Sequence, residues 1–277
     1  MKKKEYLYRV CSWLKHQLTA WNTGGEGIHS PYLFEWVRMV MSDTHAYYIW
    51  SRIEGVRRKM LESDVVVNYV DYGSGSKQIC EGLRSERLVK DIANKSVSRR
   101  KKAQMLFRLV NWLGHQMRCG EKGMSIVELG TSLGVTTSYL ASVDSRDRVL
   151  TYEGCEDVAK LASENWNVLG LNNIECCVGE IDIEKLRVKI NEIGVDVAFV
   201  DANHTYDATL KYFCVLADGV HSKSVVVVDD IHYSAEMEEA WKAICADERV
   251  TTTMDLYDMG LVFFDKHYWH RHYRMRL

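Results

Sequence analysis

The chain has 277 residues and a mass of 32.0 kDa, and its 36 Lys and Arg residues nearly balance 38 Asp and Glu residues. It therefore lacks the strong positive charge of a dedicated nucleic-acid-binding protein, and a hydrophobic content of 47% excludes extensive disorder. No apolar run reaches the roughly 20 residues of a membrane span. No signal peptide is evident, and the eight scattered cysteines form neither a CxxC pair nor a zinc-type spacing. We therefore expect a compact, reduced, cytoplasmic protein without a membrane partner.

The first part of the chain, up to residue 122, is rich in Trp, Tyr, Arg and Lys and shows helical periodicity. Ser30 followed by Pro31 is typical of a helix start, because serine caps free backbone amides and proline lacks the amide that would stay unpaired there. A second helix is expected over residues 105–116, and residues 65–72 have the pattern of a strand. We expect this region to be a helical cap that borders a substrate site or forms the surface of a homodimer.

From residue 123 on, short β-branched segments alternate with helical stretches, which is typical of βαβ units and a parallel sheet. The expected strands are Ser125–Leu129, Val149–Tyr152, Ile174–Val178, Val195–Val200 and Ser224–Val228, and the expected helices are Val135–Val143, Asp157–Leu169, Ile183–Ile193, Tyr206–Leu216 and Ala235–Asp247. Residues 251–264 have the pattern of a closing β-hairpin. The predicted fold class is α/β, with a doubly wound, mostly parallel seven-stranded sheet, a terminal antiparallel strand and an N-terminal helical cap. The predicted domains are residues 1–122 and 123–277.

A glycine-containing turn, Glu128-Leu129-Gly130-Thr131-Ser132-Leu133-Gly134, follows the first of these strands. Glycine lets the backbone approach a ligand closely, and the helix that follows offers free N–H groups. Glu128, just before the turn, is a candidate for binding a cationic or amine-bearing part of a ligand. A tight strand-to-helix turn without a ligand is the alternative interpretation.

Glu153 ends the next strand, about 20 residues after the glycine turn, which is where nucleoside-binding sheets place a carboxylate that holds both ribose hydroxyls. The alternative is an acid that stabilises the N-terminus of the following helix. Together with the glycine turn, Glu153 favours an adenosine-type ligand.

Acidic residues follow two further strands, Asp201 after one and Asp229-Asp230 after the other. The carboxyl ends of neighbouring parallel strands converge at the ligand crevice of such a sheet. Three carboxylates close together repel one another unless a proton or a cation intervenes, and oxygen ligands suit Mg²⁺ or Mn²⁺. The three acids are therefore candidate metal ligands, with helix capping as the alternative.

These four motifs, in this order, resemble those of the class I S-adenosylmethionine-dependent methyltransferases. The resemblance covers about Met124 to Lys266 and is strongest to the cation-dependent small-molecule O-methyltransferases, which include the catechol and caffeoyl-CoA enzymes and certain sugar O-methyltransferases. It implies transfer of a methyl group from S-adenosylmethionine to a hydroxyl of a small molecule, assisted by Mg²⁺ or Mn²⁺. The cofactor-binding positions that it implies are Glu128, Gly130, Thr131, Ser132, Gly134, Glu153, Gly179 and Glu180, and the metal-binding positions are Asp201, Asp229 and Asp230.

His204 is a departure from this family, whose catechol and caffeoyl-CoA members have a Lys three residues after the first metal-binding Asp. Histidine side chains can accept a proton near neutral pH, so His204 is the candidate catalytic base, with Asp201 as the second catalytic residue. A hydrogen-bond partner of Asp201 or a weak metal ligand are the alternative roles of His204. The first 120 residues have no counterpart in the minimal family enzyme.

Two further segments have chemistry-bearing residues without a clear role. Residues 71–76 (Asp-Tyr-Gly-Ser-Gly-Ser) imitate a cofactor loop, but we interpret them as a turn or lid loop, with contact to substrate or cofactor as the alternative. The basic, aromatic residues 267–274 are interpreted as a docked or frayed terminus, with binding of nucleic acid or an acidic partner as the alternative. Two alternative functions remain for the whole chain: an RNA or protein methyltransferase, and a non-catalytic cofactor-binding module. Nucleic acid is not the expected partner.

Overall fold

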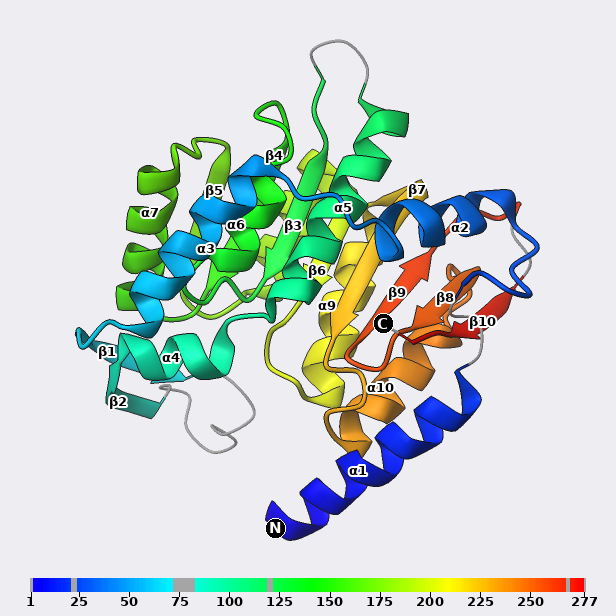
Figure 1. Cartoon of the computed structure of the whole chain (residues 1–277), viewed down its shortest axis with the longest axis horizontal. Coiled ribbons are helices and arrows are strands. Elements are labelled where there is room, and N and C mark those ends of the chain that lie inside the picture. Colours follow the sequence, from blue (N-terminus) through cyan, green and yellow to red (C-terminus); the bar gives the residue numbers. More distant parts are fainter. Residues whose placement is uncertain (1, 21–23, 72–82, 119–121, 268–269, 277) are drawn as a thin grey trace. The chain divides into compact units, whose positions relative to one another are not determined.

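The computed structural model describes residues 2–20, 24–71, 83–118, 122–267 and 270–276 (Figure 1). By its internal contacts the chain divides into two compact units. The middle unit is Asp43–Ile181, and the terminal unit joins the two ends of the chain, Met1–Ser42 and Asp182–Leu277. The predicted domain boundary after residue 122 falls inside the middle unit.

In the described part of the chain, eight strands form a mostly parallel sheet in the order β10-β8-β9-β7-β6-β3-β4-β5. The strands are β3 (Ser125–Leu129), β4 (Arg148–Glu153) and β5 (Ile174–Val178) in the middle unit, and β6 (Val195–Val200), β7 (Val220–Asp229), β8 (Thr252–Asp255), β9 (Met259–Phe263) and β10 (Arg271–Arg274) in the terminal unit. Strand β9 is antiparallel to both β7 and β8, whereas β10 is parallel to β8. The predicted α/β class and antiparallel closing hairpin are confirmed. The sheet has one strand more than predicted because the carboxyl-terminal residues dock on β8.

The middle unit packs its helices around a core of aromatic and aliphatic side chains. Its helices are α3 (Tyr48–Leu61), α4 (Val89–Ser96), α5 (Arg100–Met117), α6 (Val135–Ala141) and α7 (Glu156–Leu169), and an antiparallel hairpin is formed by β1 (Val66–Asp71) and β2 (Leu83–Leu88). Trp50, Phe107 and Tyr139 pack in one buried cluster with aliphatic side chains of α3, α4 and α7. The first 122 residues thus contain a β-hairpin besides the predicted helices.

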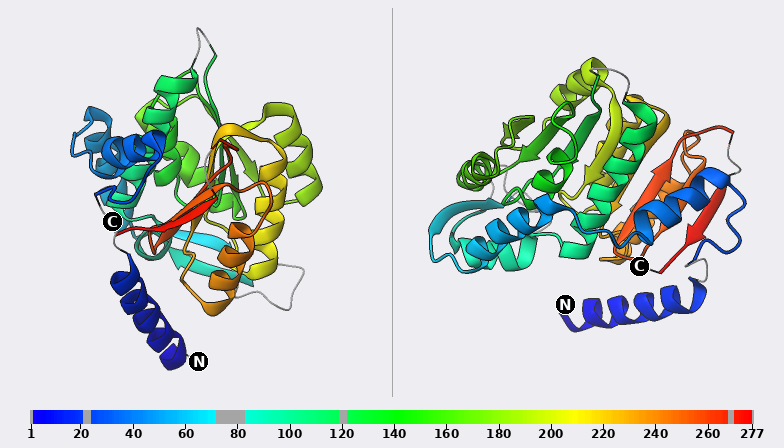
Figure 2. Two further views of the ribbon diagram at one scale, coloured as in Figure 1. Left: turned by 90° about the vertical axis from the view of Figure 1, so that its right-hand side faces the viewer. Right: turned by 45° about the horizontal axis from the view of Figure 1, so that its top comes forward.

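The terminal unit holds the remaining helices, including the first one of the chain. They are α1 (Lys2–Thr19), α2 (Pro31–Trp36), a short π-helix η1 (Val37–Met41), α8 (Ile183–Ile193), α9 (Tyr206–Asp218) and α10 (Ala235–Cys245). Helix α1 runs alongside α10 and the outer strands of this unit (Figure 2). The Tyr8 hydroxyl donates to Glu238 of α10, and Arg274 of β10 donates to the Thr19 hydroxyl at 3.2 Å.

Local sequence signals explain several of these elements. Ser30 caps α2 by accepting a hydrogen bond from the Leu33 amide at 3.4 Å, and Pro31 is the first residue of the helix, as predicted. The apolar run Val225–Val228 is at most 1% exposed, as a strand covered on both faces requires. Strand β1 confirms the predicted strand near residues 65–72, whereas residues 72–76 of the predicted loop lie outside the described residues. No helix in the described ranges is long and apolar enough to cross a membrane.

Candidate active site

The middle unit brings three predicted cofactor-binding segments to the carboxyl ends of β3, β4 and β5. The parallel register pairs Leu129 with Tyr152 and Glu153 with Val178, so the turns that follow the three strands lie at one edge of the sheet. The amides of Gly130 and Thr131 both donate to the Tyr152 carbonyl, at 3.1 and 3.0 Å. These bonds fix the glycine turn against the end of β4.

Glu128 is fully buried at the end of β3, and only one of its two carboxylate oxygens has hydrogen-bond partners among the described groups. Its Oε2 accepts hydrogen bonds from the hydroxyls of Thr137 at 2.5 Å and Thr151 at 2.7 Å. Its Oε1 has no hydrogen-bond partner among the described groups. Burial raises the pKa of Glu128 to about 7, against the opposing effect of the two threonine hydroxyls. A buried acceptor without a partner is costly, so this oxygen fits a ligand that brings a donor or a positive charge.

Glu153 ends β4 and holds the glycine turn through both carboxylate oxygens. Oε2 accepts from the Ser132 amide at 2.7 Å, and Oε1 accepts from the Cys155 amide at 3.0 Å. Burial raises the pKa of this carboxyl group, although these backbone amides oppose the shift. Each oxygen keeps a further lone pair for a ligand hydroxyl. The buried hydroxyl of Ser132 has no partner among the described groups, which adds a second unsatisfied polar atom to this edge.

The remaining predicted cofactor-binding residues differ in their surroundings. The Gly179 amide donates to the Glu153 carbonyl at 2.8 Å, and a Cβ added at Gly179, whose φ is +112°, would meet nothing within 4 Å. Glu180 is exposed. The Thr131 hydroxyl is buried against that of Thr151, with 2.6 Å between the oxygens, so its side chain faces the sheet. Gly179 therefore leaves open space beside Glu153, whereas Thr131 has a structural role.

Gly134 is explained by packing. Its φ is +75°, and a Cβ there would lie 2.6 Å from Nε1 of Trp166, which itself donates to the Gly134 carbonyl at 3.0 Å. A glycine at this position is therefore required whether or not a ligand binds.

Replacing Gly134 by Ala should lower the free energy of unfolding by more than the same change at Gly170, which also has a φ of +75° but meets nothing within 4 Å. The left-handed backbone costs about 1–2 kcal/mol in both variants, and overpacking adds about 1–3 kcal/mol at Gly134 alone. Urea denaturation of the two variants measures the difference. Equal losses would show that Trp166 adjusts freely and that packing does not require the glycine.

The terminal unit holds the predicted metal-binding and catalytic residues. The parallel register pairs Val200 with Val228, so Asp201 and Asp229 follow at adjacent positions. Asp229 is 3% exposed, and Asp230 has a left-handed backbone whose amide donates to the Asp258 carbonyl at 2.8 Å. Within the described ranges, however, no three His, Cys, Asp or Glu residues are grouped so that they could hold a metal ion. The three acids as arranged do not fit a bound cation.

His204, the predicted base, lies beside Asp201. Its Nε2 is 3.4 Å from Oδ1 of Asp201, and both side chains are partly exposed. The ring of Tyr233 lies 6.0 Å from the His204 ring, and the Arg9 guanidinium of α1 stacks on Tyr233 at 3.7 Å. Helix α1 thus reaches the neighbourhood of His204 through Tyr233.

The sequence interpretation missed a buried polar cluster formed by His16, His232, Glu238 and Asp255. Asp255, at the end of β8, lies between the two imidazole rings. Although burial opposes it, hydrogen bonds from His16 and His232 hold the pKa of Asp255 well below its usual range. His232 could have been identified from the sequence, because it lies two residues after Asp230. His16, in contrast, is 239 residues away from Asp255, and no sequence pattern connects the two.

Comparison with known proteins matches residues 127–231 to a family model described as a methyltransferase domain. The chain carries a methyltransferase domain. Solved structures with a similar fold include an O-methyltransferase from Bacillus cereus in complex with SAH, at 17% identity and a TM-score of 0.53 over 82% of this chain and 95% of that chain. The O-methyltransferase TomG from Streptomyces achromogenes, in complex with SAM, covers 83% and 98% at 16% identity and a TM-score of 0.52. SAH-bound PaMTH1 from Podospora anserina covers 85% and 96% at 11% identity and a TM-score of 0.55.

A search of the curated proteins finds no match. The predicted methyltransferase fold is confirmed by these comparisons, and the matched segment begins in β3 and ends just after β7. It includes Glu128, the glycine turn, Glu153, Asp201 and Asp229-Asp230.

Proposed function

We propose that the chain is an S-adenosylmethionine-dependent O-methyltransferase that transfers a methyl group to a hydroxyl of a small molecule. The observation that carries the proposal is the buried carboxylate of Glu128, one oxygen of which has no hydrogen-bond partner among the described groups. Glu128 and Glu153 end neighbouring parallel strands, and open α/β sheets generally bind their ligands at the carboxyl ends of the strands. SAH or SAM is bound in solved structures of the same fold. When bound, this cofactor supplies a methyl group already activated on a sulfonium sulfur.

The residues of the chain then have separate tasks. Oε1 of Glu128 would accept a hydrogen bond from the amino group of the cofactor. Glu153 would accept hydrogen bonds from the ribose hydroxyls through the lone pairs that the Ser132 and Cys155 amides leave free. His204, oriented by Asp201, would take the proton of the acceptor hydroxyl, and the cofactor would give up its methyl group and leave as S-adenosylhomocysteine. Holding the reactants at contact distance removes much of the entropic part of the barrier.

Assistance by Mg²⁺ or Mn²⁺ at Asp201, Asp229 and Asp230 is the remaining part of the proposal, and its support is the sequence resemblance. Because the three acids do not form a cation-binding group as arranged, we assign no step of the reaction to a metal.

Methyl transfer from radiolabelled S-adenosylmethionine to a panel of small hydroxyl compounds tests the proposed function. Turnover with at least one compound supports it, whereas transfer only to RNA or protein would change the acceptor class. Cofactor binding without transfer to any acceptor would make the chain a non-catalytic module. Turnover that is lost in chelator and restored by Mg²⁺ supports the cation, and unchanged turnover removes the metal from the proposal.

The affinity for SAH should rise with pH up to about 7 and be constant above it, because the Glu128 carboxyl has a pKa of about 7 in the free protein. Below that pH the carboxyl is protonated, and a ligand with an ammonium group must displace the proton, so the affinity should fall by about tenfold for each pH unit. Calorimetric titration with SAH from pH 5 to 8 measures this slope.

Two controls assign the slope to the contact between Glu128 and the amino group. Methylthioadenosine lacks the amino-acid part and should bind with a constant affinity over this range. The Glu128→Gln variant should show no slope with SAH. A slope that persists in Glu128→Gln would contradict the assignment of the amino group to this residue.

A further inference from the structure

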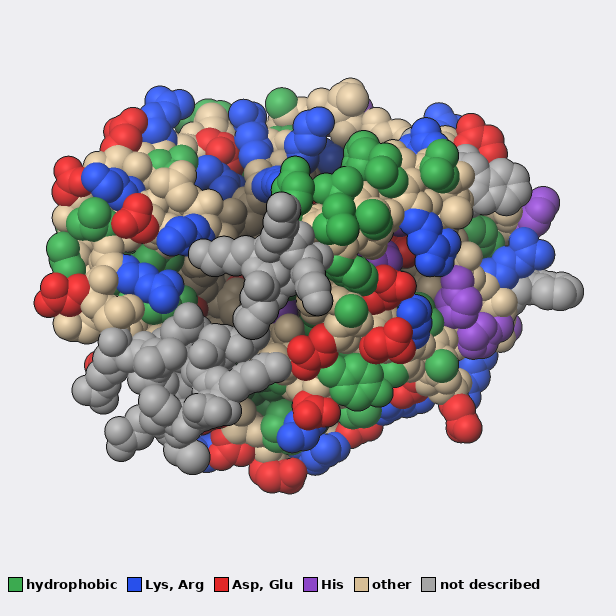
Figure 3. Space-filling view, turned by 90° about the horizontal axis from the view of Figure 1, so that it is seen from below, with side chains coloured by type: hydrophobic (Ala, Val, Ile, Leu, Met, Phe, Trp, Pro, Cys, Tyr) green, Lys and Arg blue, Asp and Glu red, His purple; other side chains and the backbone are tan. Residues whose placement is uncertain are grey.

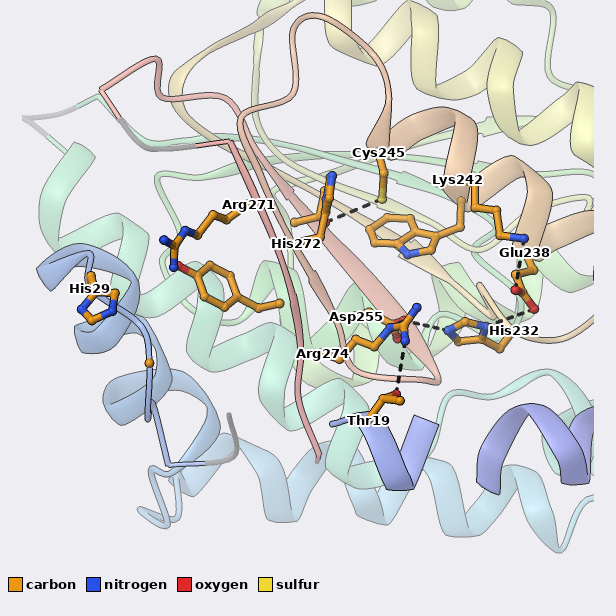
Figure 4. Close-up of a pocket in the computed structure, with 14 residues that line it drawn as sticks. Thr19, His29, His232, Glu238, Lys242, Cys245, Asp255, Arg271, His272 and Arg274 are labelled. Carbon is orange, nitrogen blue, oxygen red and sulfur yellow. Dashed lines mark hydrogen bonds and ion pairs between the residues drawn. The ribbon is translucent and has the colours of Figure 1, made fainter. Parts of the chain in front are cut away.

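Helix α1 presents its polar side to the rest of the terminal unit. Tyr8, Ser12 and Gln17 are half-buried on this side, and His16 is buried. Polar side chains of α1 contact α10, β8 and β10 in three pairs, Tyr8 with Glu238, His16 with Asp255, and Thr19 with Arg274. A dashed line in Figure 4 marks the contact between Thr19 and Arg274. The side of α1 that is held against the unit is therefore polar.

The opposite side of α1 is apolar and open to solvent. Its large apolar side chains are between 36% and 85% exposed and form the outer face of α1, which consists of Tyr6, Leu7, Val10, Trp13, Leu14 and Leu18. Positions 7, 10, 14 and 18 follow one another at spacings of three and four residues, so they form a row along the helix. Hydrophobic side chains gather next to one another on the face of the molecule that carries α1 (Figure 3). A surface helix normally buries its apolar side, so this inverted arrangement indicates an interaction surface.

The charge of α1 is strongly positive. Its sequence contains one acid, Glu5, and five basic residues, which are Lys2, Lys3, Lys4, Arg9 and Lys15. Lys15 is exposed between two residues of the outer face, Leu14 and Leu18. Glu238, the acid of α10 that contacts α1, is itself paired with Lys242 at 3.3 Å. A partner that fits the outer face is therefore apolar where it meets these side chains and negatively charged around them.

The surface of an anionic phospholipid bilayer combines these two properties. Helices that lie on such a surface carry Lys and Arg together with Leu and aromatic residues, and their apolar side chains lie among the headgroups and the upper acyl chains. Tyr6 and Trp13 are amphipathic rings of the kind enriched at that depth. A second copy of α1 would bring the same excess of basic charge. The seam of a helix pair also uses about two positions in seven residues, whereas Leu7, Val10 and Trp13 already make three in residues 7–13.

We propose that the outer face of α1 binds the surface of an anionic phospholipid bilayer. The helix lies along the surface, with its apolar side chains in the headgroup region and its basic residues near the charges of the lipids. The lack of a membrane-spanning helix in the described ranges does not exclude this contact, because a helix that lies on the surface need not cross the bilayer. None of the residues proposed for methyl transfer takes part, so the contact is independent of the proposed function.

Flotation of the full-length protein with lipid vesicles tests the proposal. Vesicles with equal parts of phosphatidylglycerol and phosphatidylcholine are compared with vesicles of phosphatidylcholine alone. We expect binding to the anionic vesicles to be tighter by about tenfold or more, because basic residues near an anionic surface are attracted to it, and to weaken as the salt concentration rises. Equal binding to both kinds of vesicle, or no binding to the anionic ones, would overturn the proposal.

The double variant Leu7→Gln/Leu14→Gln tests the apolar part of the contact. Both side chains are exposed, so the fold does not depend on them, and their removal should weaken binding to the anionic vesicles by about tenfold or more. Val188→Gln is the matched control, since Val188 of α8 is 70% exposed in the same unit but does not belong to α1. Equal affinities of the double variant and the control would contradict the assignment of the contact to α1.

The charged part of the contact is tested by replacing Lys2, Lys3 and Lys4 together by Gln. We expect this triple variant to lose most of its preference for anionic vesicles. The matched control replaces three exposed lysines of the same unit by Gln, which are Lys185, Lys211 and Lys223. Sedimentation velocity without vesicles separates the other occupant. A dimer that the Leu7→Gln/Leu14→Gln variant abolishes, together with no binding to vesicles, would overturn the proposal and assign the outer face to a second copy of the chain.

Discussion

Replacing His204 by Gln is expected to lower the rate of methyl transfer by about a hundredfold or more and to leave the affinity for SAH unchanged. General-base catalysis contributes about 10²–10⁴-fold, and Gln can accept a hydrogen bond but cannot take the proton. His204 lies 3.4 Å from Asp201 in the terminal unit, whereas the residues proposed to bind the cofactor belong to the middle unit. Single-turnover rates and calorimetric SAH titrations separate the two effects.

A matched control for this variant is His221→Gln. His221 also pairs with an aspartate, with 2.7 Å between its Nε2 and Oδ1 of Asp196, but it is not among the proposed site residues. We expect its rate to stay within about twofold of the wild-type rate, because substitutions away from special features change free energies by about 0.5 kcal/mol or less. A rate for His204→Gln equal to that of His221→Gln would show that another group removes the proton.

The regular part of the fold could be predicted because each element carries its own signal. The β-branched run Val225–Val228 favours a buried strand, and the pattern of residues 251–264 predicts the antiparallel hairpin that closes the sheet. Such signals depend on residues close together in the chain. Strand β10 gives no such signal, because its four residues are charged or aromatic and are held by pairing with β8.

The sequence predicted those residues of the candidate site that stand at the ends of strands. Glu128 and Glu153 lie at the ends of β3 and β4 in the middle unit, and Asp229 ends β7 in the terminal unit, where the strand pattern places each of them. The orientation of the side chains did not follow from this pattern. Gly134 is needed for packing against Trp166, which depends on the backbone geometry of the turn. Asp201, Asp229 and Asp230 do not form a group that could hold a cation, which depends on how their side chains are oriented.

The cluster around Asp255 could not be predicted from the sequence. His16 comes from α1, His232 from the loop before α10, and Asp255 from β8, so only the folded terminal unit brings them together. Isolated histidines in a sequence are common and most have structural roles, so neither His16 nor His232 stood out alone. Their burial and the unpaired Nδ1 atoms distinguish them, and both are properties of the fold.

Replacing Glu153 by Ala should weaken binding of both SAH and adenosine by about a hundredfold or more. Two hydrogen bonds from ribose hydroxyls to a charged acceptor contribute about 1.5 kcal/mol each, or ~3 kcal/mol together. Adenosine contains the ribose but lacks the amino-acid part, so Glu128→Gln should weaken SAH alone. Calorimetric titration of both ligands against both variants therefore tests whether the two carboxylates bind different parts of the cofactor.

The alternative role of Glu153, as an acid that stabilises the start of α7, predicts a different pattern. In that case Glu153→Ala would lower the melting temperature, since the Ser132 and Cys155 amides would lose their acceptor, but it would leave both affinities nearly unchanged. The control Glu156→Ala removes an exposed acid from the first turn of the same helix and should affect stability alone. A loss of SAH affinity without a loss of adenosine affinity would place Glu153 away from the ribose, because only the amino-acid part differs between the two ligands.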